Sequence, residues 1–191
     1  IETRGRSKQL TVNYRTTYEI ERAAAQLRGV EIDDLEGDHT REPATQSLLR
    51  GPRPILRGFE DRDDEVEFVV TTIASLVSEG VRPKEIAIFG RTWAKLSRFR
   101  NELRFRGLPA ADRRDDGLER NEVKLSTMHG AKGLEFRYVF VIGCTKSSLP
   151  LRSVLRGAQD DDELEVITER ERNLLYVAMT RARDQVWITW A

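Results

Sequence analysis

The sequence has little cysteine and little histidine, with one and two copies among 191 residues. A single thiol, Cys144, excludes an internal disulfide and a cysteine-cluster metal site, and it fits a reducing compartment such as the cytoplasm. No apolar run approaches the roughly 20 residues needed to cross a bilayer, and no signal peptide is recognisable, so we expect no membrane partner. The first residue is Ile1, and we expect the chain to be a segment of a longer polypeptide.

An excess of charge of either sign is also missing, because 32 basic residues balance 32 acidic ones. No overall field therefore attracts nucleic acid, and any such binding must come from local patches. The length suits one domain with a full core, and the supply of Leu, Ile, Val and Phe is that of a folded chain. We find no internal repeat and no low-complexity segment.

Segments with strand and helix periodicity alternate along the chain. Short apolar or alternating runs predict strands at about 10–14, 54–59, 85–89, 122–127, 138–142 and 185–190. Apolar residues at helical spacing predict helices from about Thr16 to Leu27, from the acidic run at 61–65 to Gly80, over 96–103, and from a start between Asp160 and Thr168. This alternation predicts an α/β fold with a mainly parallel sheet flanked by helices.

Two capping boxes and three loops complete this prediction. Thr16 with Glu19, and Thr168 with Glu171, have the spacing by which a hydroxyl and a carboxylate cap a helix start. Charged or turn-rich stretches predict irregular loops at 30–53, 107–121 and 144–163.

The stretch STMHGAKGLEF, residues 126–136, has the glycines and lysine of a phosphate-binding loop but not their order. The Walker-type loop places its lysine after the second glycine and a hydroxyl next to it. Here Lys132 precedes Gly133 and Leu134 follows. The stretch therefore cannot hold a triphosphate in that way, and another function must explain it.

Four strings in fixed order explain it better. They are VNYRTT at 12–17, EIAIFGRTWAKLSRF from residue 85, TMHGAKGLEFRYVFVIG at 127–143 and ERNLLYVAMTRARD at 171–184. Together they resemble the second RecA-like domain of UvrD/Rep-type superfamily 1A DNA helicases. The resemblance spans the chain, with motif regions at 8–29, 85–106, 122–143 and 168–184, and it implies a RecA-like α/β fold.

The resemblance implies an ATP site. By likeness Tyr14 stacks on adenine, Glu135 binds the ribose, and Arg15 and Arg181 reach the γ-phosphate, with Arg181 as the arginine finger. A permanently charged planar guanidinium suits that catalytic role. Taken alone, Tyr14 would be a half-buried strand aromatic, and Arg181 would be a cation that favours a helix C-terminus.

The resemblance also implies contacts to single-stranded DNA from Arg91, Thr127 and His129. Hydroxyl, imidazole and guanidinium groups are all suited to phosphates. No second ligand accompanies His129 at metal spacing, so we expect no metal site in this chain. Trp93 either stacks on a base or packs at the start of its helix. For Lys132 a phosphate contact and a solvated charge stay equally open, and Cys144 is interpreted as inert packing.

The sequence lacks the Walker loop, the acidic magnesium-binding strand end and the Gln motif. The resemblance assigns these to the first RecA-like domain of the same polypeptide, which would hold ATP with magnesium. We therefore expect the C-terminal motor domain of an ATP-dependent DNA helicase or translocase, inactive alone. Larger relatives insert a helical subdomain where 107–121 leaves room only for a loop. Two alternatives stay open: a non-catalytic RecA-like module that binds DNA or protein, and the motor part of a helicase-nuclease.

Overall fold

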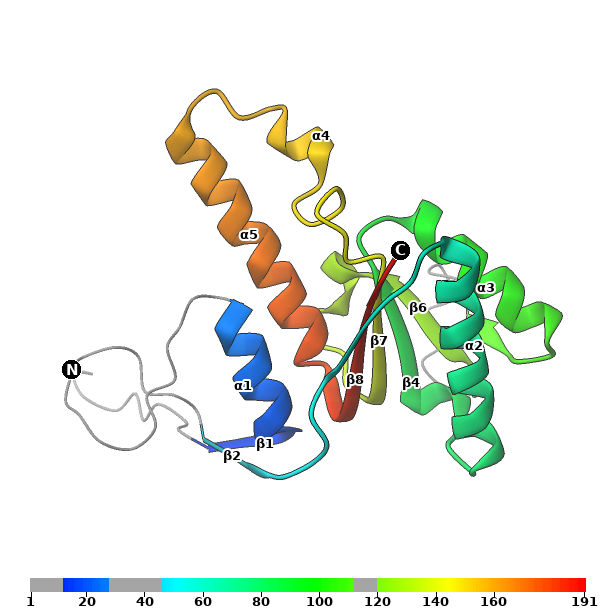
Figure 1. The fold of residues 1–191 in the computed structure, drawn as a ribbon. Helices are drawn as coiled ribbons and strands as arrows, with labels where there is room; N and C mark the ends of the chain where they lie inside the picture. Colours follow the sequence, from blue (N-terminus) through cyan, green and yellow to red (C-terminus); the bar gives the residue numbers. More distant parts are fainter. Residues whose placement is uncertain (1–11, 28–45, 112–119) are drawn as a thin grey trace, which may run out of the picture.

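The structure, a computed structural model, describes residues 12–27, 46–111 and 120–191 (Figure 1). The predicted strand start at Leu10 and parts of the predicted loops at 30–53 and 107–121 lie outside these residues. The strands are β1 Val12–Thr17, β2 Gln46–Leu49, β3 Ile55–Gly58, β4 Ile86–Gly90, β5 Ala110–Ala111, β6 Val123–Thr127, β7 Phe136–Ile142 and β8 Ala182–Trp190. The helices are α1 Tyr18–Leu27, α2 Arg62–Ser78, α3 Trp93–Phe105, α4 Arg152–Leu155 and α5 Asp161–Met179, with short 3-10 helices η1 Pro83–Glu85 and η2 Met128–Ala131.

Six strands form the central sheet in the order β3-β8-β7-β4-β6-β5, and every pairing in it is parallel. Strands β1 and β2 form a separate parallel pair. The predicted α/β class with a mainly parallel sheet is therefore confirmed. Because all six strands run the same way, the loops after β4, β6 and β7 gather at one edge of the sheet.

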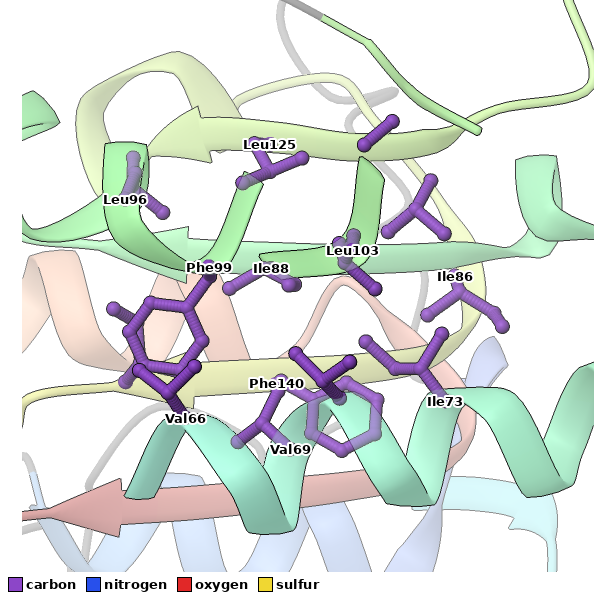
Figure 2. Packing of buried hydrophobic residues seen from close by; sticks show 14 of the residues in the cluster. Val66, Val69, Ile73, Ile86, Ile88, Leu96, Phe99, Leu103, Leu125 and Phe140 are labelled. Atoms are coloured by element: carbon purple, nitrogen blue, oxygen red, sulfur yellow. The ribbon is translucent and has the colours of Figure 1, made fainter. Parts of the chain in front are cut away.

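Helices α2 and α3 cover one face of the sheet, and α1 and α5 cover the other (Figure 1). Figure 2 shows the first of these cores, in which Val69 and Ile73 of α2 lie against Phe140 of the sheet. The Phe140 ring stacks on Trp187 with centroids 4.5 Å apart and planes at 8°. Burial of such aromatic surface supplies much of the stability of this layer.

Strand β7 shows why the predicted run at 138–142 is almost continuously apolar. Phe140 and Ile142 belong to the core under α2 and α3, while Val139 and Val141 belong to the core under α1 and α5. Successive side chains of a strand point to opposite faces, so a strand covered on both faces needs apolar residues at every position.

A buried carboxylate ties the carboxyl ends of two central strands together. Glu65 of α2 is 3% exposed and accepts hydrogen bonds from the Gly143 amide at 2.8 Å and from the Thr189 hydroxyl at 2.6 Å. Lys95 of α3 donates to the Gly143 carbonyl at 3.1 Å and to the Ser148 hydroxyl. This network fixes the loop after β7 to the helices above it.

Several predicted boundaries are wrong. The loop predicted at 30–53 contains β2, the loop at 107–121 contains β5, and the loop at 144–163 contains α4. The observed start of α5, Asp161, lies within the predicted range from Asp160 to Thr168. Strand β2 is only four residues long and its sequence, QSLL, does not alternate clearly. Short elements of this kind are specified by their partner strand rather than by local pattern.

Both predicted capping boxes are also wrong. Helix α5 begins at Asp161, and its N-cap Asp160 accepts from the Glu163 amide at 2.8 Å, so Thr168 and Glu171 lie inside the helix. The Thr168 hydroxyl donates to the Leu164 carbonyl one turn earlier. Helix α1 begins at Tyr18, so the residue that precedes it is Thr17 rather than Thr16, and the Thr17 hydroxyl accepts from the Ile20 amide at 3.4 Å.

Candidate functional site

A cleft of about 890 Å³ runs along one face of α5. The residues of α5 that line it recur at helical spacing over about three turns, or about 15 Å of helix. These residues are Ile167, Arg170, Glu171, Asn173, Leu174 and Val177. The complete lining includes five lysine or arginine side chains and a single carboxylate, so the cleft carries a local positive charge in a chain with none overall. Such a cleft favours an anionic ligand.

The opposite wall of the cleft is the segment after β6, where the string STMHGAKGLEF lies. Met128 and Ala131 are one 3-10 turn apart and are both buried, which fixes η2 on the sheet. This orientation leaves His129 and Lys132 exposed and lining the cleft. Gly133 has a φ of +81°, a left-handed conformation that favours glycine. The segment leads into strand β7 and not into a helix, so it does not have the architecture of a Walker loop.

Tyr14 and Arg15 lie on β1 beside this segment. Tyr14 is 68% exposed as a residue, so it is not the half-buried strand aromatic that its local pattern alone would suggest. Arg15 lines the cleft and forms an ion pair with Glu135, both side chains being about half exposed. Exposed pairs of this kind contribute about 0–1 kcal/mol, so either partner is readily exchanged for a ligand.

Arg181 follows α5 at the same end of the cleft. Its Nε donates to the Val177 carbonyl at 3.0 Å, and Nη1 reaches the Leu134 carbonyl at 3.4 Å. Burial lowers the pKa of Arg181, and the charge of Arg15 lowers it further. The guanidinium stays charged, because an arginine pKa far above neutrality tolerates such a shift. A negative group bound near Arg15 and Arg181 would offset both effects, because an opposite charge raises the pKa of an arginine.

Arg91 has a different environment from the other predicted site residues. Its Nε and Nη2 donate to the two Glu171 oxygens at 2.8 and 2.7 Å. The side chains are 11% and 6% exposed, so this is a buried bidentate pair that joins the loop after β4 to α5. The DNA contact predicted for Arg91 stays a prediction. In the structure, Nε and Nη2 of its guanidinium already donate to Glu171.

A smaller hollow of about 440 Å³ is lined in part by Glu135 and shares Gly133 with the cleft. Arg137 and Arg183 line it, and both donate to Asp184. Burial pushes the pKa of Asp184 up, but the bonds from Arg183 and Arg137 outweigh burial and hold it below its usual value. The positive charges of Arg137 and Arg183 are partly neutralised by Asp184. This neutralisation distinguishes the hollow from the cationic cleft.

The structure thus brings four of the predicted residues, Arg15, Arg91, His129 and Arg181, to one cleft. Glu135 lies just outside it, and Thr127 is half buried at the end of β6. Trp93 is the first residue of α3 and packs against the core under that helix, as the second of its two interpretations predicts.

Three participants were not found from the sequence. They are Arg170, which lines the cleft, Glu171 in its pair with Arg91, and Glu21, which bonds to Tyr176. Helical spacing of 167, 170, 174 and 177 was the available signal for Arg170. No local signal exists for contacts between residues 80 or 155 positions apart.

Within the described ranges, no group of three or more His, Cys, Asp or Glu side chains is arranged to hold a metal ion. None of the helices described combines the length and apolar character needed to cross a bilayer.

Comparisons with known proteins bear on the cleft and the motif segments. The family profile described as UvrD-like helicase C-terminal domain matches residues 110–191. The ATP-dependent DNA helicase PcrA of Staphylococcus epidermidis is 43% identical over 75 residues, which cover 39% of this chain and 10% of the relative. PcrA of Staphylococcus aureus strain Mu50 is 42% identical over 77 residues, covering 40% of this chain and 10% of the relative. The matched part of the chain therefore covers about a tenth of the length of these relatives.

One solved structure extends the likeness to nearly the whole chain. It is the C-terminal domain of a possible DNA helicase from Lactobacillus plantarum WCFS1, with a TM-score of 0.62 and 21% identity. The superposition covers 94% of this chain and 88% of that one. At this identity the likeness establishes the fold.

Proposed function

We propose, from the match of residues 110–191 to the UvrD-like helicase C-terminal domain family, that the chain is the C-terminal motor domain of an ATP-dependent DNA helicase or translocase. In this role it completes an ATP site and contacts single-stranded DNA. One observation carries the proposal: Arg15 and Arg181, far apart in sequence, line the same cationic cleft.

The nucleotide end of the cleft is the end with these two arginines. Arg15 exchanges its weak pair with Glu135 for a γ-phosphate, and Glu135 is then available to the ribose hydroxyls. Arg181 is the arginine finger, since its charge is held in a partly buried place with a like charge beside it. Tyr14 offers an exposed ring on which adenine stacks.

The DNA contacts are assigned to the segment after β6. His129 is exposed there, and the Thr127 hydroxyl lies at the carboxyl end of β6, one residue before the turn. Arg91 lines the same cleft as His129 and is held in its pair with Glu171. With so few cationic contacts, binding of single-stranded DNA by this chain alone should be weak. It should weaken as salt is added, but with a shallow slope, because the slope scales with the number of phosphates neutralised.

The other half of the ATP site belongs to a first RecA-like domain that this sequence does not contain. Magnesium ligands are expected there, because the family resemblance assigns the acidic magnesium-binding strand end to that domain. The cationic cleft is the surface that such a domain would face. The 191-residue chain alone should therefore bind ATP weakly and hydrolyse none.

The experiment compares DNA-stimulated ATP hydrolysis by this chain with that by the natural polypeptide from which it comes. We expect turnover from the longer polypeptide and none from the chain. Significant turnover by the pure chain would contradict the assignment of a half site. A natural polypeptide that is no longer than this chain and hydrolyses no ATP would favour a non-catalytic binding module.

A further inference from the structure

A carboxylate on α1 links the two parts of the chain that carry the phosphate-facing arginines. Glu21 lies on α1 and is half buried. One of its oxygens accepts from the Asn13 amide nitrogen Nδ2 at 3.1 Å, and the other accepts from the Tyr176 hydroxyl at 2.9 Å. Asn13 belongs to β1 and Tyr176 to α5, so Glu21 joins two elements that are distant in sequence.

The contact on the β1 side reaches the backbone of Arg15. The Oδ1 of Asn13 accepts a hydrogen bond from the Arg15 amide at 2.8 Å, which fixes the chain on both sides of Tyr14. An asparagine side chain that bonds the backbone two residues on holds a local turn. Because Glu21 holds the other end of the Asn13 amide, it also fixes which way that amide faces.

The contact on the α5 side reaches Arg181. Tyr176 lies in the last turn of α5, and Val177, the next residue, accepts from Nε of Arg181 at 3.0 Å. A shift of this turn relative to α1 would move the guanidinium. Glu21 therefore acts on the two arginines through Asn13 and Tyr176, without contact to the ligand itself.

We propose that Glu21 is a positioning residue that holds Arg15 and Arg181 in register for one phosphoryl group. The inference rests on the proposed function. Catalytic groups need placement within fractions of an ångström, and displacement by about 1 Å can cost on the order of a hundredfold in rate. A carboxylate suits this place because both neighbours donate to it.

Two substitutions separate the hydrogen bonds from the bulk of the side chain. Glu21→Leu keeps similar size and removes both acceptors. Glu21→Gln keeps one acceptor for Asn13, and its amide can donate to the Tyr176 hydroxyl, which accepts as well as donates. We expect Glu21→Leu to lower kcat by about tenfold to a hundredfold with a smaller change in KM for ATP. We expect Glu21→Gln to retain most of the wild-type kcat.

Glu19 on the same helix gives a matched control. It accepts from the Gly51 amide at 2.9 Å and pairs with Arg50, so it ties down a different segment. Glu19→Leu therefore removes a half-buried carboxylate of α1 without touching Asn13 or Tyr176. We expect it to reduce stability to a similar extent and to leave kcat within about twofold of wild type.

The assay is DNA-stimulated ATPase of the natural polypeptide that carries this segment, with urea unfolding of each variant alongside. A Glu21→Leu variant with wild-type kcat would overturn the inference, and so would a Glu19→Leu variant with the same loss of kcat. Arg181→Ala is measured in the same series. If wild type has no DNA-stimulated ATPase, or if Arg181→Ala hydrolyses ATP like wild type, the proposed function itself fails.

Discussion

The buried pair between Arg91 and Glu171 makes a stability prediction whose size follows from its geometry. The two side chains are 11% and 6% exposed and share two charged hydrogen bonds of 2.8 and 2.7 Å. In Glu171→Ala the Arg91 guanidinium loses its partner, while the Arg91 side chain stays largely buried. An unpaired buried charge of this kind costs about 3–5 kcal/mol, a large part of the stability of a typical domain.

The measurement is urea unfolding of the 191-residue chain at neutral pH, with the unfolding free energy obtained by linear extrapolation. A double-mutant cycle with Arg91→Met and Glu171→Met completes it. Because apolar residues of similar size replace both charges, we expect the double variant to lose less than either single variant. The difference measures the coupling between the two residues.

A loss below about 1 kcal/mol in Glu171→Ala would refute this account of the pair. Such a result would mean that the pair behaves as a surface ion pair and that Arg91 is free to turn toward DNA. If the large loss is found, Arg91 is a structural residue first. In the stable double variant, DNA affinity should then fall less than in His129→Ala, measured by fluorescence anisotropy at low salt.

Three further predictions concern other parts of the chain. Gly143→Ala should lower the unfolding free energy by about 1–3 kcal/mol, because Gly143 has a φ of +64° and an added Cβ would lie 2.9 Å from the Lys95 side chain; equal thermal melting of the variant would contradict this. Burial raises the pKa of the Cys144 thiol to about 12, so about one thiol in ten thousand is ionised at pH 8 and a disulfide reagent should label it slowly until urea is added; fast labelling of the native chain would argue against it. The pKa of Asp184 is lowered in the folded state, so its contribution is complete above the unfolded pKa of about 3.9 and is lost as the pH falls below about 4; Asp184→Asn should flatten the acid limb of the stability curve, and an unchanged limb would count against the ion pairs.

The alternating pattern of the sequence predicts most of the sheet and its covering helices. Strand β7 could be predicted because a strand covered on both faces leaves a continuous apolar run. Strand β2 could not, because four residues with one clear apolar pair carry too little signal. The sequence predicts the start of α5 only as a range, from Asp160 to Thr168, because Thr168 and Glu171 imitate a cap; the structure places the start at Asp161, with Asp160 as the N-cap.

The candidate site was predictable to the extent that its residues lie in short strings. Arg15, His129 and Arg181 follow from those strings, and the structure places them on one cleft. The ion pair of Arg91 with Glu171 could not be predicted from those strings, because Glu171 lies 80 residues away on a helix. For the same reason Glu21 was missed, since its role depends on the packing of α1 against α5.

The central claim is that Arg181 supplies an arginine finger to an ATP site shared with another domain. Arg183, two residues on, is a matched control because it is exposed, pairs with Asp184 and does not line the cationic cleft. The most direct measurement is DNA-stimulated ATP hydrolysis by the natural polypeptide carrying Arg181→Ala or Arg183→Ala. The account predicts a loss of about a thousandfold or more for Arg181→Ala and nearly full activity for Arg183→Ala. Equal activity in the two variants would contradict it.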